Sequence, residues 1–195
     1  MLLLVLGLVV FLGVHLLPTS TALRQSFIGR LGAGTYKLAF SAVSLAGLVL
    51  IIYGYHKLQI NPGKNVILWD PPTWTKHIAF ALMLPAMIFL AASQIPSRIR
   101  TALKHPMLIA IKTWALAHLI ANGDLASLAL FGSFLAYAIY DRISLKHRTS
   151  LGPLGTRTGG ALNDVLVIAV GVALYAAMLL WGHSALIGVP LLRAA

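Results

Sequence analysis

Long apolar runs are the feature of this sequence that most restricts how the chain can fold. A helix that crosses a bilayer needs about 20 largely apolar residues, within a range of about 17–25. Runs that approach or reach this length occupy residues 2–18, 36–56, 76–94, 106–121, 124–141 and 163–182. We therefore expect an all-α integral membrane protein, a bundle of six transmembrane helices that forms one domain over residues 1–195.

Composition excludes most soluble alternatives. Of the 195 residues, 59% are hydrophobic and only 10% are charged, whereas about a quarter of the residues of a soluble domain are charged. A chain this short has a large surface for its volume and could not hide so much apolar material from water. A soluble enzyme, a nucleic-acid-binding domain and a disordered protein are therefore poor interpretations.

The first apolar run could instead be a secretory signal. Against cleavage, no Lys or Arg precedes the run, and the stretch Pro18-Thr19-Ser20-Thr21 is a poor cleavage site. The run also carries His15, which a removed segment would not need. We expect residues 2–18 to remain as a helix.

The basic charge predicts the orientation in the membrane. The chain has fifteen Lys and Arg residues against four acidic ones, for a net charge of +11. Ten of the fifteen cations lie in or beside three alternate linkers, and they are Arg24, Arg30, Lys37, Arg98, Arg100, Lys104, Arg142, Lys146, Arg148 and Arg157. The positive-inside rule places these linkers in the cytoplasm and both termini outside. The charge then attracts anionic lipid headgroups, and nucleic acid is not needed to explain it.

Ionisable groups inside apolar segments are costly, so each is a functional hypothesis. In the predicted topology, His15 and His105 lie at the cytoplasmic level, and His56, His77 and His118 form a second layer at the opposite level, of unknown role. His105 precedes Pro106, a residue favoured at the first position of a helix. The positive end of the helix dipole then disfavours imidazolium and keeps the His105 ring neutral, as a metal or haem ligand must be.

Simpler interpretations compete with these. A histidine at a helix end is more often a hydrogen-bonded interface residue than a ligand, and Lys112, two turns beyond His105 on nearly the same face, could extend to the interface. The run Asn122-Gly123-Asp124 is typical of a tight turn. Asp141 and Arg142 are adjacent and suggest an ion pair at a helix end. Spacings of small residues such as Gly47 to Ala42 and Gly132 to Ala136 predict close helix packing.

The longest specific motif joins two of these helices. It comprises Lys104-His105-Pro106-Met107, then the run WALAHLIANGDLAS from Trp114 to Ser127, then Leu130-Phe131-Gly132. With Gly13-Val14-His15 and Trp69-Asp70-Pro71-Pro72, it resembles the NnrU family of bacterial membrane proteins over essentially the whole chain. Lys104 replaces the arginine common before His-Pro in that family and keeps the charge.

The resemblance implies both a role and a cofactor. NnrU-like proteins are associated with denitrification through nitrite and nitric oxide reductases, which implies the bacterial inner membrane and possible contact with that machinery. The family is also similar to plant 15-cis-zeta-carotene isomerase, which uses haem b with histidine ligands. By this resemblance, the metal ligands here are His15 and His105. The cations expected to meet the haem propionates or to lie near the cofactor are Arg24, Arg98, Arg100, Lys104 and Lys112.

Three alternatives remain open at this point. The first is a haem-dependent cis-trans isomerase of a hydrophobic polyene, although the chain has no cysteine to serve as an alternative ligand. The second is a haem-free assembly or scaffold protein. The third is an isoprenylcysteine-type methyltransferase, which shares a His-Pro motif but uses a C-terminal Arg/Glu motif. The chain has no glutamate, which argues against the third.

Overall fold

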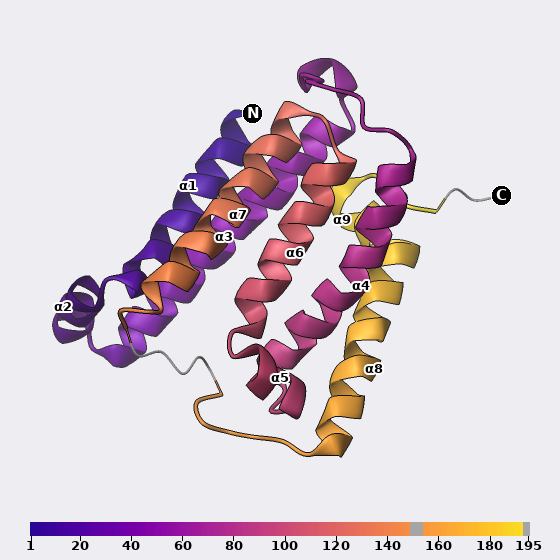
Figure 1. The fold of residues 1–195 in the computed structure, drawn as a ribbon. Coiled ribbons are helices and arrows are strands. Elements are labelled where there is room, and N and C mark those ends of the chain that lie inside the picture. The colour runs from indigo at the N-terminus through magenta and orange to yellow at the C-terminus, as the bar shows by residue number, and fades with distance from the viewer. Residues whose placement is uncertain (149–153, 193–195) are drawn as a thin grey trace.

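The computed structural model describes residues 1–148 and 154–192, which are helical apart from loops and one isolated β-bridge between Ile67 and Asp124. The helical elements of this part of the chain, in order, are α1 (Leu2–Leu16), η1 (Leu17–Thr19), α2 (Thr21–Leu31), α3 (Ala33–Gln59), η2 (Pro62–Lys64), α4 (Trp74–Gln94), α5 (Arg98–Leu103), α6 (Pro106–Ala121), α7 (Leu125–Ser144), α8 (Ala161–Ala177), the π-helical turn η3 (Met178–Gly182) and α9 (His183–Ile187). In Figure 1 the long helices run side by side, and the short helices α2 and α5 lie at one end of the bundle. The prediction of an all-helical fold is confirmed for these residues.

Short polar side chains determine where several helices begin. The Ser20 hydroxyl accepts a hydrogen bond from the Leu23 amide before α2, and Ser97 does the same for the Arg100 amide before α5, at 3.1 Å. Asp124 opens α7 by accepting the Ser127 amide at 2.8 Å. Each bond satisfies one of the N–H groups that the first turn of a helix leaves without a partner.

Four segments are long and apolar enough to cross a membrane. They are Leu2–Thr19, Ala33–Gln59, Trp74–Gln94 and Ala161–Ile187. The fourth predicted span coincides with α6, which is apolar but has only 16 residues. The fifth corresponds to α7, whose last turns carry polar residues. The structure therefore supports a membrane protein with four candidate spans, and the total of six stays a prediction.

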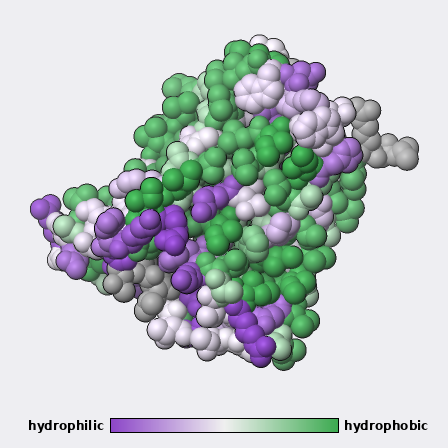
Figure 2. All heavy atoms as spheres, viewed as in Figure 1, coloured by the Kyte–Doolittle hydropathy of each residue, from purple (hydrophilic) through white to green (hydrophobic). Residues whose placement is uncertain are grey.

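The apolar surface of these helices suits lipid. Large hydrophobic side chains such as Leu38, Leu162 and Leu180 are more than two-thirds exposed. In the view of Figure 2, hydrophobic residues cover most of α4 and α8, and hydrophilic residues gather toward the end that carries α2 and α5.

Glycines allow the helices to approach closely. α1 packs along α3, and a Cβ added at Gly47 would lie 2.8 Å from the Phe11 amide nitrogen. Gly7 and Gly54 face the partner helix in the same way. The prediction of close packing is right for Gly47. It is wrong for Gly132, where an added Cβ would have no neighbour within 4 Å.

The described parts of the three basic linkers lie at the same end of the bundle (Figure 1). Hydrogen bonds join them to one another: the Ser144 hydroxyl donates to the Thr19 carbonyl, and an Arg100 nitrogen donates to the Gly155 carbonyl. At the other end, the loop before α4 pairs with the α6–α7 connection, where the Leu68 amide donates to the Gly123 carbonyl at 2.8 Å. Residues 122–124, where the sequence predicts a tight turn, form instead a short connection between α6 and α7 in which Asn122 and Asp124 are extended.

Candidate functional site

His15 and His105 line one cavity of about 470 Å³. His15 comes from the end of α1, and His105 is the residue immediately before α6. We call this space the basic cavity, because Arg100, Lys104 and Arg148 also line it. Two histidines separated by 90 positions in the sequence are thus brought to the same site.

The orientation of the His15 ring is held from several sides. Its Nδ1 lies 2.7 Å from the Phe11 carbonyl oxygen. A carbonyl only accepts, so Nδ1 carries the hydrogen and Nε2 keeps its lone pair. The ring stacks on Phe11 with 4.2 Å between centroids, and it packs edge-on against Phe40 and Tyr137, whose ring centroids lie 5.1 and 6.2 Å from its own. Metal-ligating histidines usually donate their other ring N–H to a carboxylate, a backbone carbonyl or water, so this arrangement is compatible with His15 as a metal ligand.

His105 is the N-cap residue of α6, and its side chain makes no capping hydrogen bond. Burial, and after it the nearby Arg142 guanidinium, lowers the pKa of His105 below its usual value. The direction agrees with the sequence-based expectation of a neutral ring. The causes are burial and the neighbouring cations.

A strained turn precedes His105. Lys104 has φ 62° and ψ −49°, and the His105 amide donates to the Leu103 carbonyl at 2.6 Å. These values describe a classic γ-turn, which is rare and strained. Lys104 is the only non-glycine residue with positive φ in residues 1–148 and 154–192. Strain of this kind, about 1–3 kcal/mol, is concentrated at functional sites.

The cations of the basic cavity are themselves organised. Arg148 forms a hydrogen-bonded ion pair with Asp141, in which the two side chains are 11% and 12% exposed. The expected pairing of Asp141 with Arg142 is therefore wrong, because the chain turns after α7 and returns Arg148 onto the carboxylate. The Arg100 guanidinium donates to the carbonyls of Gly155 and Arg157, each at 2.9 Å, and so attaches the loop before α8 to α5.

Other predicted cofactor residues lie elsewhere. The Arg98 side chain is 70% exposed and lies 3.9 Å from the Asp164 carboxylate. Neither Arg98, Arg24 nor Lys112 is among the described residues that line the basic cavity. Arg148, one of the ten linker cations, lines the basic cavity instead. The signal for this position in the sequence is that Arg148 lies only seven residues after Asp141, its ion-pair partner.

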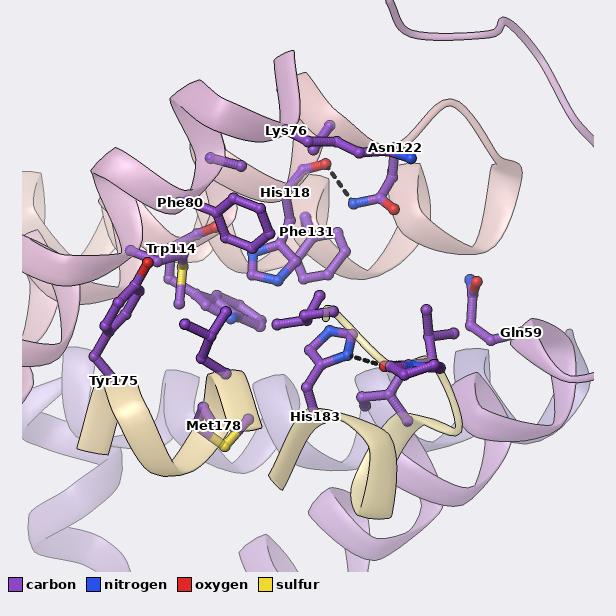
Figure 3. A pocket seen from close by; sticks show the side chains of 18 of the residues that line it. Gln59, Lys76, Phe80, Trp114, His118, Asn122, Phe131, Tyr175, Met178 and His183 are labelled. Carbon is purple, nitrogen blue, oxygen red and sulfur yellow. Dashed lines mark hydrogen bonds between the residues drawn. The ribbon is translucent and has the colours of Figure 1, made fainter. Parts of the chain in front are cut away.

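The second histidine layer does not form one site. His118 lines a second cavity, of about 390 Å³. His56 lies outside that cavity, with Nδ1 3.1 Å from the Leu186 carbonyl oxygen, and His77 is exposed near the start of α4. His183, which the sequence analysis did not single out, also lines the second cavity (Figure 3). Its position one residue after the predicted span 163–182 was the available signal.

A buried polar network adjoins this second cavity. The Asp124 carboxylate accepts hydrogen bonds from the Ser127 hydroxyl at 2.6 Å and from the Asn65 amide at 2.7 Å. It also accepts the Gln59 amide at 3.4 Å. The Tyr55 hydroxyl lies 2.7 Å from the Ser127 hydroxyl. The network fixes the end of α3, the loop before α4 and the start of α7 relative to one another.

Within residues 1–148 and 154–192 no three His, Cys, Asp or Glu residues come together as a metal site, although two histidines are enough to hold a haem iron.

Comparison with known proteins identifies the family. No curated protein and no solved structure matches the chain. The family model described as NnrU protein matches residues 3–191. The chain therefore belongs to the NnrU family.

Proposed function

We propose that this protein binds haem b in the basic cavity, where His15 and His105 would hold the iron, and acts in nitrogen-oxide metabolism in a bacterial inner membrane. The observation that carries the proposal is the meeting of these two histidines on one cavity beside Arg100, Lys104 and Arg148.

The residues that line the basic cavity are suited to hold a haem. His15 presents a lone pair on Nε2 because its Nδ1–H is bonded to the Phe11 carbonyl. Phe11, Leu108, Ile111 and Phe134 give the cavity apolar walls, as a macrocycle requires. The volume of about 470 Å³ falls within the range of small-molecule and cofactor sites, about 300–1,000 Å³.

The protein residues have separate tasks. Phe11 orients His15 through its carbonyl and its ring. The lowered pKa of His105 keeps its ring in the neutral form, which can bind a metal ion. Lys104 supplies positive charge for carboxylates such as haem propionates, whereas the charge of Arg148 is already paired with Asp141. Bound haem would supply one-electron exchange, tuned by its axial ligands and by burial.

The membrane topology is part of the proposal. Helix α6 rises about 24 Å over its 16 residues, somewhat less than a hydrocarbon core of about 30 Å. With α7 beside it, α6 completes six spans, and the shared end of the basic linkers is the cytoplasmic side. The basic cavity then opens near the cytoplasmic surface.

The absorption spectrum of protein purified in detergent tests haem binding directly. We expect a Soret band that is strongly reduced in His15→Ala and His105→Ala. His77→Ala is the matched control, because His77 is exposed and lines neither described cavity. A Soret band of unchanged height in both ligand variants would overturn the assignment.

The same preparation separates the alternatives. A colourless protein that co-purifies with reductase subunits would support a scaffold role. Isomerisation of a polyene by the haem-loaded protein would support the isomerase. For the metabolic role, nitrite and nitric oxide reductase activity in a deletion strain should be restored by His77→Ala and not by His105→Ala.

A further inference from the structure

The second cavity has a consistent chemical character. We call it the aromatic cavity, since Tyr55, Phe80, Trp114, Phe131 and Tyr175 line it. His118 of α6 and His183 of α9 reach it from opposite sides (Figure 3). Its volume of about 390 Å³ is sufficient for a ring with substituents.

Both histidines present hydrogen-bond acceptors to this space. His118 Nδ1 lies 2.8 Å from the Trp114 carbonyl oxygen, and His183 Nδ1 lies 2.7 Å from the Val189 carbonyl oxygen. Since a carbonyl cannot donate, each Nδ1 carries the hydrogen and each Nε2 carries a lone pair. The His118 ring is further held by stacking on Phe131, at 4.4 Å between centroids.

Tyr55 is a third acceptor, by the same reasoning. Asp124 as a carboxylate only accepts, so the Ser127 hydroxyl hydrogen points to Asp124. Ser127 must then accept from the Tyr55 hydroxyl, at 2.7 Å. The Tyr55 hydrogen is thereby used, and only a lone pair of its oxygen remains for a ligand.

Polar donors also line the cavity, and among the described residues the Tyr175 hydroxyl and the Trp114 indole N–H have no hydrogen-bond partner. The Gln59 amide nitrogen bonds to Asp124, and the Asn122 amide nitrogen bonds to the His118 carbonyl at 2.9 Å. Lys76 is an exposed side chain. The cavity therefore offers three acceptors beside these donors, and a hydroxyl group, which both donates and accepts, is complementary to such a lining.

The backbone near His183 is also unusual. The chain changes from α8 to a π-helical turn at Met178–Gly182 immediately before His183. Such turns inside a helix are rare and are often found at functional sites. Here the turn belongs to the segment that carries one of the two opposed imidazoles.

We propose that the aromatic cavity binds the reduced ring of a membrane-soluble hydroquinone. Its two hydroxyls donate to Nε2 of His118 and of His183, and the aromatic side chains pack against its flat ring. Met83, Met87 and Met178, which also line the cavity, adapt to ring substituents and to the start of a tail. This site is independent of the haem proposed for the basic cavity.

Three ring compounds of nearly one shape test the proposal on the detergent-purified full chain. The probes are tetramethylhydroquinone, its quinone and its dimethyl ether, and binding is measured anaerobically by equilibrium dialysis. We expect the hydroquinone to bind at least tenfold more tightly than either of the others, because each neutral hydrogen bond is equivalent to about three- to tenfold in affinity. Equal affinity for the hydroquinone and its dimethyl ether would overturn the proposal without any change to the protein.

Variants then locate the site. His118→Phe and His183→Phe should each weaken hydroquinone binding by about three- to tenfold, and His77→Phe should bind as the wild type does. Circular dichroism and the Soret band check that the fold and the basic cavity are retained. Unchanged binding in both variants, or a metal ion or second haem that is lost from them, would overturn the proposal.

Discussion

Substituting Gly47 by alanine tests how the fold orients His15. In the structure, an added Cβ at Gly47 would lie 2.8 Å from the Phe11 amide nitrogen and 2.9 Å from the Phe11 Cβ. Both neighbours belong to the packed part of α1 and cannot rotate away. Phe11 is the residue whose carbonyl accepts from His15 Nδ1, so the displacement reaches the proposed ligand.

Two opposing effects set the magnitude. Alanine in place of glycine inside a helix stabilises by about 0.5–1 kcal/mol, whereas overpacking a tight contact costs about 1–3 kcal/mol. At Gly47 the second effect dominates, and we expect a net loss of about 0.5–2 kcal/mol. At Gly13, an exposed position of α1 with no atom within 4 Å of the added Cβ, only the first effect operates.

The assay is thermal unfolding in detergent, followed by circular dichroism for Gly47→Ala and Gly13→Ala in parallel. Gly47→Ala should unfold below the wild type and Gly13→Ala at or above it. If haem is bound, Gly47→Ala should also retain less of it after dilution. A Gly47→Ala protein as stable as Gly13→Ala would show that α1 and α3 are not in the close contact described, and the argument for His15 would fail.

Three further substitutions probe the strained turn and the polar anchors. Lys104→Gly should raise the free energy of unfolding by about 1 kcal/mol, since glycine adopts positive φ without strain. The control is Lys104→Gln, which keeps the strain. A Lys104→Gly protein that is no more stable than Lys104→Gln would contradict the reasoning. Asp124→Ala should cost about 3 kcal/mol in denaturant unfolding, because it leaves buried donors such as the Asn65 amide without a partner. Asp164→Ala should speed limited proteolysis near α5, because the Asp164 carboxylate accepts the Arg98 amide at 2.7 Å; unchanged cleavage would count against that anchor.

Much of the fold follows from the sequence because apolar length alone determines most of the helices. The predicted span 106–121 has the same bounds as α6. The predicted span 36–56 is shorter than α3, which extends from Ala33 to Gln59, because hydropathy does not register the polar turns at helix ends. Hydropathy also does not decide whether α6 and α7 cross the membrane.

The candidate site was harder to predict, because it depends on which helices pack together. Depth in the membrane was enough to group His15 with His105, and the structure brings both to one cavity. Depth in the membrane did not distinguish His118, which lines the aromatic cavity, from His56, which lies outside it beside the Leu186 carbonyl. The role of Arg148 depends on a chain reversal after α7, and hydrophobic patterning carries no information about such a reversal.

Helix α6 supplies a wall to both cavities. Its first turns, as far as Ile111, line the basic cavity, and from Trp114 onward it lines the aromatic cavity. A ligand that shifts or tilts this helix at one end therefore alters the shape of the cavity at the other. Any such coupling is reciprocal. If a ligand in the basic cavity changes the affinity of the aromatic cavity by some factor, a ligand in the aromatic cavity must change the affinity of the basic cavity by the same factor.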